Sequence, residues 1–155
     1  MNRYTDSNWC RDIDDMKSTT GYIFLLGGAP VPWCSRKEPM VSLSSCEAEY
    51  IAVSICACQA VWLMNLIDEI GVEKCGGVNL RIDNISTINL AKNPIPYGRS
   101  KHIEMRFHYL GEQVSKGKLK LELCRSENQV ADVLTKGDKI EMLIKLIIER
   151  YNVLI

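Results

Sequence analysis

The longest periodic segment of the chain runs from Cys46 to about Ile70, with apolar residues recurring at helical spacing. Ser44, followed three residues later by Glu47, has the form of a capping box and predicts the start of a helix. Gly71 predicts its end, because glycine readily adopts the left-handed conformation found after a last helical turn. We expect the apolar stripe of this helix to face a β-sheet.

Short apolar runs bounded by glycine and proline predict strands before and after the long helix. In chain order the expected strands are Asn2–Trp9, Tyr22–Leu26, Val31–Ser35, Val78–Asp83 and Lys118–Cys124. Gly28-Ala29-Pro30 separates the second from the third and predicts a hairpin turn. The first strand begins almost at residue 1, which indicates that the chain was cut from a longer one. The first strand is then a candidate for truncation.

Helical spacing returns in the second half of the chain. The expected helices are Ile85–Lys92 capped by Asn84, one capped by Ser100 that carries Ile103, Phe107, Leu110 and Val114, Gln129–Lys136, and a last one from Asp138 through Ile147. Together, the elements predict an α/β domain with a mixed sheet of five strands. We expect this domain to span residues 1–137, with a C-terminal helical tail at 138–155.

The bulk composition excludes several classes of protein. In 155 residues, 46% hydrophobic and 25% charged residues are typical of a folded globular chain. No apolar run reaches the roughly 18 residues of a membrane span, and the first residues lack the pattern of a signal peptide. The net charge is zero, so only a local basic patch could attract nucleic acid. The seven irregularly spaced cysteines favour reduced thiols over a zinc site or a disulfide framework.

The stretch SLSSCEAEYIAVS places two acids, Glu47 and Glu49, at the start of the long helix. At 100° per residue their side chains point about 160° apart. Glu49 lies within about 40° of Val53 and Cys56 on the apolar stripe, so we expect it to face the sheet. Glu47 is expected to be the solvated capping residue.

A buried glutamate needs a partner, because an unpaired carboxylate is costly to bury. One explanation is an ion pair between Glu49 and a lysine or arginine. The other is a group of acids, with Asp6 in the first strand, Asp83 at the end of the fourth and Asp132 near a helix start. Taken one at a time, each aspartate fits an ordinary cap or turn residue better than a functional one.

If these acids meet, they require a cation, because two carboxylates 4 Å apart repel by roughly 4 kcal/mol at an effective dielectric constant of 20. A ligand set made only of oxygen suits Mg²⁺ or Mn²⁺. Two such ions can hold the attacking water and the leaving oxygen of a phosphodiester. This hypothesis predicts metal-dependent hydrolysis of nucleic acid.

Five segments of the chain carry a resemblance to a known family. They are YTDS, SSCEAEYIA, IDNISTINLAKNP, SKHIEMRFHY and QVADVLTK, together with the longer stretch WCSRKEPMVSLSSCEAEY. In order and approximate spacing they resemble the ribonuclease H domain that follows the reverse transcriptase in Ty1/Copia-type retrotransposon polyproteins. The resemblance covers about Asn2 to Lys136. It implies the ribonuclease H-like fold, a five-stranded mixed sheet with three antiparallel strands first.

The resemblance also implies an activity, which is cleavage of the RNA strand of an RNA–DNA hybrid. The implied cofactors are two Mg²⁺ ions, with Mn²⁺ as their substitute. The acidic tetrad of the family falls on Asp6, Glu49, Asp83 and Asp132. By analogy Asp6 bridges both ions, Glu49 and Asp83 hold the ion near the leaving 3′ oxygen, and Asp132 helps hold the ion that activates water.

The implied partners are the hybrid and the reverse transcriptase and integrase parts of a parent polyprotein, without a membrane. The implied location is a cytoplasmic virus-like particle or the nucleus, and the protein is not expected to be secreted. Two positions depart from the family pattern. Asn8 stands where many copies carry a second acid, and Cys124–Val130 lacks the histidine that many cellular relatives place in this loop.

Several residues outside the tetrad are candidates for substrate contact, either through phosphate groups or as part of the family motifs. They are Arg36, Lys37, Asn84, Lys101, His102 and Arg106. The alternative for each residue is a solvated surface side chain or a structural contact with another side chain. The three tryptophans are expected in the core or at its rim rather than as base-stacking platforms. The alternative for the whole chain is a decayed or repurposed fragment, a nucleic-acid-binding or interaction module that folds but no longer cuts.

Overall fold

A computed structural model describes residues 1–71, 77–93 and 101–136 of the chain. One sheet organises the fold, with β1 at its centre and strand order β3-β2-β1-β4-β5. The strands are β1 Asn2–Asn8, β2 Thr19–Leu26, β3 Ala29–Lys37, β4 Val78–Ile82 and β5 Leu119–Leu123. β1, β2 and β3 are antiparallel, whereas β4 is parallel to β1 and to β5. The predicted α/β fold with a five-stranded mixed sheet is therefore confirmed.

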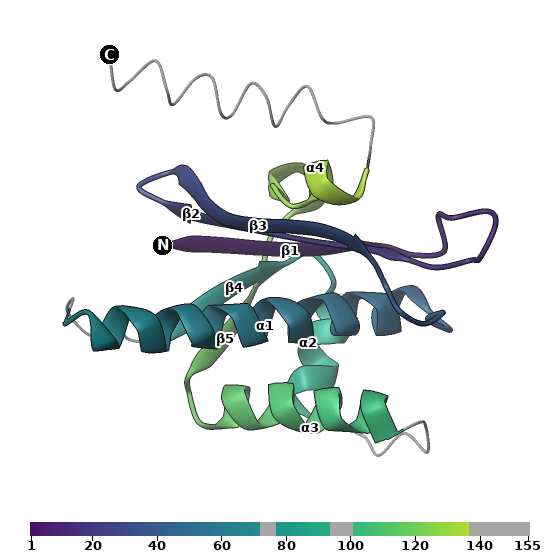
Figure 1. The fold of residues 1–155 in the computed structure, drawn as a ribbon. Coiled ribbons are helices and arrows are strands. Elements are labelled where there is room, and N and C mark those ends of the chain that lie inside the picture. The colour runs from purple at the N-terminus through teal and green to yellow at the C-terminus, as the bar shows by residue number, and fades with distance from the viewer. Residues whose placement is uncertain (72–76, 94–100, 137–155) are drawn as a thin grey trace, which may run out of the picture.

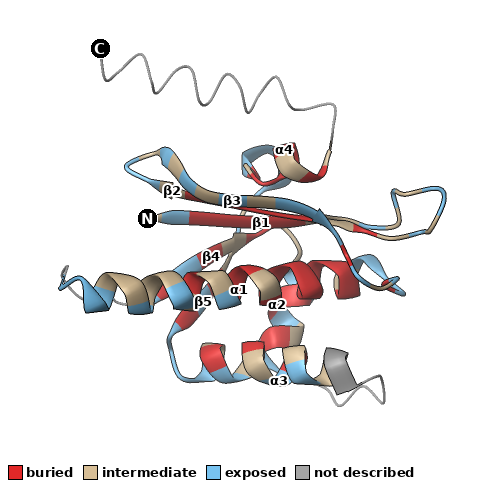
Figure 2. Cartoon of the chain, in the orientation of Figure 1, coloured by how far each residue is buried: buried red, intermediate tan, exposed pale blue. Residues whose placement is uncertain are grey.

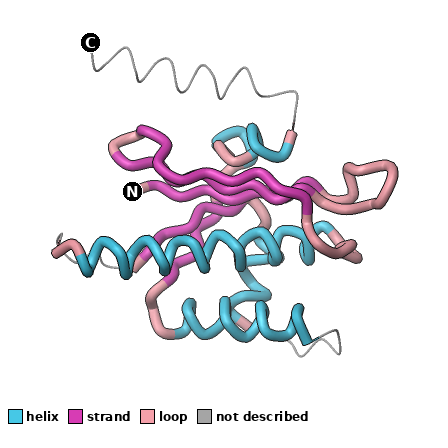
Figure 3. Tube along the Cα trace, viewed as in Figure 1, coloured by secondary structure: helices cyan, strands magenta, loops and turns pink. Residues whose placement is uncertain are grey.

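Helices cover the two faces of the sheet unequally (Figure 1). The helical elements are α1 Ser45–Glu69, α2 Ile85–Lys92, α3 Lys101–Ser115, the 3-10 turn η1 Ser126–Asn128 and α4 Asp132–Thr135. α1 lies against one face with α2 and α3 on the same side, and the short α4 lies alone against the other face (Figure 3). The predicted helix Gln129–Lys136 is wrong in detail, because only Asp132–Thr135 of this range is helical and η1 lies before it. The predicted last helix and the helical tail lie outside the described residues.

The core lies between the sheet and α1 (Figure 2). Tyr50 is fully buried on α1, and its ring stacks on Phe107 of α3 with ring centroids 4.0 Å apart. Leu110 follows on the same face of α3 and is also fully buried. These contacts confirm the apolar stripe expected on α3 for the residues that the structure describes.

α1 begins as predicted but uses Glu47 differently. The Ser44 hydroxyl accepts a hydrogen bond from the Glu47 backbone N–H at 3.1 Å, as an N-cap should. The Glu47 carboxylate in turn accepts the Leu43 N–H at 2.7 Å. Only 8% of Glu47 is exposed, so the expectation of a solvated residue is wrong. The chain entering the helix folds over this side chain and uses it as an acceptor.

By length and composition, α1 could cross a membrane, and in the described part of the chain no other helix passes that test. The expectation that no segment is long and apolar enough is therefore wrong for α1. Its first half nevertheless packs in the core against the sheet, and the core helix of a soluble protein passes the same test.

The β2–β3 hairpin forms as predicted, with its turn one residue earlier. Gly27 and Gly28 make the turn with φ of 58° and 88°, which glycine adopts at little cost. Pro30 already belongs to β3 and pairs with Leu25. β3 tolerates proline because it is an edge strand, with one side free of ladder hydrogen bonds.

The tryptophans lie at the surface. Trp9, Trp33 and Trp62 are 46%, 56% and 57% exposed, so the rim placement holds and the core placement is wrong. Trp9 donates its indole N–H to the Ser42 carbonyl at 3.0 Å, which ties the end of β1 to the chain entering α1.

Candidate metal centre

Three aspartates from distant parts of the chain meet at one end of the sheet. Asp6 lies in β1, Asp83 directly follows β4, and Asp132 is the first residue of α4. One carboxylate oxygen from each lies within 4.8 Å of the others. β1 and β4 are adjacent and parallel, so their carboxyl ends deliver Asp6 and Asp83 to the same edge.

The first strand holds Asp6 firmly. All seven residues of β1 pair with β2, and Asp6 is 3% exposed. The truncation of the first strand that the sequence suggested stays a prediction.

A glycine allows α4 to approach the sheet at this point. Gly21 of β2 is the register partner of Asp6, so its missing side chain would point the same way. A Cβ atom there would lie 2.8 Å from Leu134 Cβ and 3.0 Å from Thr135 Cγ2. Any larger residue would therefore push against α4. The sequence analysis missed Gly21, although an interior strand glycine often marks a close approach of another backbone.

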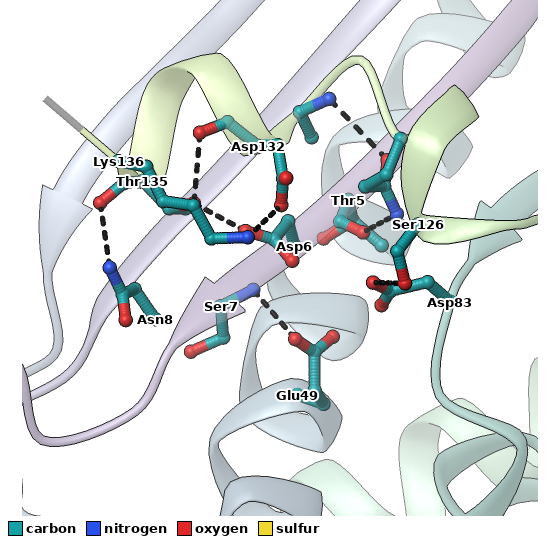
Figure 4. A network of polar contacts seen from close by, with 12 residues as sticks. Thr5, Asp6, Ser7, Asn8, Glu49, Asp83, Ser126, Asp132, Thr135 and Lys136 are labelled. Carbon is teal, nitrogen blue, oxygen red and sulfur yellow. Dashed lines mark hydrogen bonds and ion pairs between the residues drawn. The ribbon is translucent and has the colours of Figure 1, made fainter. Parts of the chain in front are cut away.

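Side chains of β1 fasten the end of α4. The Thr135 hydroxyl donates to Asp6 Oδ2, and the Asn8 amide donates to the Thr135 carbonyl at 3.2 Å. Gln129 donates to the Thr5 carbonyl at 2.8 Å just before α4 (Figure 4 shows the side chains around β1). Asn8 departs from the family pattern, and its amide donates a hydrogen bond that an ionised acidic side chain could not donate.

Glu49 approaches the same region from the other face of the sheet, on α1. It is 5% exposed, and its Oε1 accepts the Ser7 N–H at 2.8 Å. Its Oε2 is buried and has no hydrogen-bond partner. Among the described residues no lysine or arginine forms an ion pair with it. The prediction that Glu49 faces the sheet is therefore confirmed, and the ion-pair explanation finds no support in the described part of the chain.

Burial dominates the electrostatics of these acids. Removal from water raises the pKa of Asp6 to about 7, with the negative charges of Asp132 and Asp83 adding to the shift. Burial likewise raises the pKa of Glu49 to about 9, with Asp6 and Asp83 contributing repulsion. A cation among the carboxylates would remove both penalties, because it stabilises their charged forms.

Two further side chains contact the aspartates (Figure 4). The Lys136 ammonium lies 2.7 Å from Asp132 Oδ1. The Ser126 hydroxyl donates to Asp83 Oδ2 at 3.1 Å. Ser126 belongs to the loop in which the sequence lacks the expected histidine, so this loop reaches the acids through a hydroxyl instead. The sequence analysis named neither residue as part of the site.

Among the predicted substrate contacts whose side chains are described, Arg36, Lys37 and Asn84 have other partners or face solvent. Arg36 is exposed on β3, and Lys37 beside it forms ion pairs with Asp12 and with Asp15, the latter at 3.2 Å. The Asn84 side chain caps α2 by accepting two backbone N–H groups.

On α3, Arg106 lies 3.3 Å from the Ser54 hydroxyl, to which it donates. The side chains of Lys101 and His102 lie outside what the structure describes. The substrate role of all six residues stays a prediction.

The donor set fits a hard divalent cation. Every candidate ligand atom of Asp6, Asp83 and Asp132 is a carboxylate oxygen, which Mg²⁺ and Mn²⁺ prefer. The free buried oxygen of Glu49 would also be satisfied by a nearby cation.

Comparison with known proteins identifies the family. The chain is 36% identical over 136 residues to the retrovirus-related Pol polyprotein from transposon RE2 of Arabidopsis thaliana, which covers 88% of the chain. It is 38% identical over 133 residues to the corresponding polyprotein from transposon TNT 1-94 of Nicotiana tabacum, which covers 86%. The chain is homologous to a segment of the Ty1/Copia-type retrotransposon Pol polyproteins. It spans 9% and 10% of the length of these two relatives. No family model matches it.

Solved structures show that this chain has the ribonuclease H fold. The N-terminal RNase H domain of a Mycobacterium tuberculosis protein superimposes with a TM-score of 0.61 at 10% identity, covering 92% of this chain and 94% of that one. LC11-RNase H1, solved with an RNA/DNA hybrid, gives a TM-score of 0.59 at 14% identity, covering 91% and 97%. At such low identities the structural likeness establishes the fold alone. The relationship to the family rests on the similarity to the polyproteins.

Proposed function

We propose that this chain is a metal-dependent endonuclease that cleaves the RNA strand of RNA–DNA hybrids. One observation carries the proposal, namely the convergence of Asp6, Asp83 and Asp132 at the carboxyl ends of the two central parallel strands. Glu49 supports it, because it lies close enough to repel Asp6 and Asp83 and keeps one buried oxygen without a partner. The Pol relatives and the ribonuclease H fold point to the same chemistry.

The four acids would differ in their roles in metal binding according to their positions. Bound Mg²⁺ ions would supply an activated water and stabilise the leaving oxygen of the phosphodiester. Asp6, on the central strand, would contact both ions, with Asp83 and Glu49 on one side and Asp132 on the other. The Ser7 N–H and the Thr135 hydroxyl already hold Glu49 and Asp6 in place, so little reorganisation would be needed.

The partners follow from the polyprotein relationship and belong to the proposal. The substrate would be the hybrid made during reverse transcription, and the reverse transcriptase and integrase parts of a parent polyprotein would act beside this domain. Reverse transcription would place the domain in a cytoplasmic particle or in the nucleus.

The test is cleavage of a hybrid with labelled RNA by the purified chain in Mg²⁺ and in Mn²⁺. We expect RNA cleavage by the wild type, loss of at least about 100-fold in Asp83→Asn because a metal ligand is removed, and no loss in Asp68→Asn. Asp68 is a matched control because it is an exposed acid near the far end of α1. A folded wild type that cuts nothing in either metal would favour the decayed or repurposed fragment.

A further inference from the structure

Lys136 brings a positive charge to the acids. Its ammonium nitrogen lies 2.7 Å from Asp132 Oδ1, an i, i+4 ion pair formed across α4. Asp6 and Asp83 also attract this charge, and Asp6 is in turn stabilised in its charged form by Lys136. Figure 4 shows the lysine side chain running from the end of α4 toward Asp132 and Asp6. Lys136 therefore partly neutralises the whole cluster.

The lysine and a divalent cation would compete for the same carboxylate. The Asp132 side chain is 4% exposed and cannot turn freely away from the cluster. Mg²⁺ binds oxygen at about 2.0–2.1 Å, so an ion on Asp132 Oδ1 would lie less than about 5 Å from the ammonium. Two cations at that distance repel strongly where water is scarce. Simultaneous occupation is therefore unfavourable.

The side chain of Lys136 is much more exposed than that of Asp132. Its side chain is 39% exposed, so the ammonium can swing into water without disturbing the core. Asp6 by contrast is buried, is held by Thr135 and pairs with Gly21 of β2. A rigid set of acids with one mobile cation is the arrangement expected of an exchangeable counter-ion.

We propose that Lys136 is an internal counter-ion that pairs with Asp132 in the metal-free protein and is displaced when a divalent cation binds. The inference rests on the proposed function only in that the acids must bind such cations. Lys136 thereby stabilises the cluster without metal and weakens its affinity for metal.

The first measurement is a titration of the full chain with Mn²⁺, followed through the electron paramagnetic resonance signal of the free ion. We expect Lys136→Met to bind Mn²⁺ about tenfold more tightly than the wild type, because a competing charge is removed. The matched control is Lys116→Met, which removes a lysine from another i, i+4 pair, with Glu112 at 2.6 Å on the exposed side of α3. Its Mn²⁺ affinity should equal that of the wild type.

The second measurement is thermal unfolding in a chelator and in saturating Mn²⁺. Lys136→Met should unfold at a lower temperature than the wild type in the chelator, and Mn²⁺ should remove the difference. A purely structural lysine would lower the unfolding temperature equally in both conditions. If Lys136→Met fails to fold, Lys136→Gln takes its place under the same criteria.

The outcomes separate this inference from the proposed function. A folded Lys136→Met that binds Mn²⁺ no more tightly than the wild type would overturn the counter-ion role and leave the nuclease proposal standing. A folded wild type that binds no Mn²⁺ would overturn both.

Discussion

Glu47 and Glu49 lie two residues apart and serve different purposes. Glu47 turns back to the chain entering α1 and accepts the Leu43 N–H, so it stabilises the start of the helix. Glu49 reaches the end of β1 and accepts the Ser7 N–H with one oxygen, leaving the other buried and without a partner. The helical angle between them decides which one joins the acids.

Replacing each glutamate by glutamine should separate these two tasks. Glu49→Gln should lower hybrid cleavage at least about 100-fold, because an amide is a poor ligand for Mg²⁺. Glu47→Gln should leave cleavage intact and lower the free energy of unfolding by about 1 kcal/mol, since a charged acceptor at the helix start becomes neutral. Cleavage assays and urea unfolding measure the two effects. Equal loss of cleavage in both variants would contradict the assignment.

The stability of the metal-free protein should depend on pH through Glu49. Its folded pKa is raised from 4.5 to about 9 by burial and by the neighbouring acids. The folded state therefore keeps a proton that the unfolded chain releases, and the free energy of unfolding falls as pH rises between these values.

Glu49→Gln removes this titration, so its unfolding free energy should fall less steeply than that of the wild type between pH 5 and 8. Thermal or urea unfolding in a chelator measures the difference. Parallel curves for the two proteins would show that Glu49 is not a raised-pKa acid.

At the scale of the elements, the site depends on how closely α4 approaches the sheet. α4 has only four residues, and contacts with β1 and β2 hold it in place. Gly21 provides the space, while Asn8 and Gln129 provide hydrogen bonds from either end. The position of Asp132 is thus set by residues of other elements.

Gly21→Ala should displace α4 and weaken the metal site. The added methyl would overlap Leu134 and Thr135, which should lower the free energy of unfolding by about 1–3 kcal/mol and weaken Mn²⁺ binding. Gly27→Ala is the matched control, because it places a methyl at a strained φ of 58° with no atom within 4 Å. That control should lose stability while keeping its Mn²⁺ affinity. Unchanged Mn²⁺ affinity in a folded Gly21→Ala would contradict this role for the glycine.

At the scale of the whole molecule, the topology gathers acids that are far apart in sequence. The chain forms β1 at residue 6, returns to it with α1 at residue 49, lays β4 beside it before residue 83, and crosses to the other face before residue 132. β1 is central because it pairs with both halves of the fold. Burying Asp6, Glu49 and Asp132 in this way, with Asp83 half-buried beside them, lowers stability unless cations accompany them.

Divalent cations should therefore stabilise the entire fold. A cation that binds only the folded state at 100 times its dissociation constant adds about 2.7 kcal/mol, which corresponds to a rise of roughly 5–10 °C in Tm for a domain of this size. Differential scanning calorimetry with and without Mn²⁺ measures it. Asp83→Asn should lose most of the rise and Asp68→Asn should keep it. The same rise in both variants would place the stabilising ion elsewhere.

Much of the local structure could be predicted from the sequence because it depends on near neighbours. Ser44 caps α1 and Asn84 caps α2 as the sequence indicates, since capping joins residues two or three positions apart. Period-two alternation likewise predicted β5, and helical spacing predicted the buried face of α3. The direction of Glu49 follows from the pitch of one helix.

The tertiary structure alone decided which groups from distant elements come into contact. The burial of Glu47 depends on the path of the chain before α1. The place of α4 depends on the space that Gly21 leaves on β2. Ser126 and Lys136 join the site only because loops and helix ends meet there. Sequence periodicity reports which way a side chain points along its own element, whereas the group that it meets is set by packing between elements far apart in the chain.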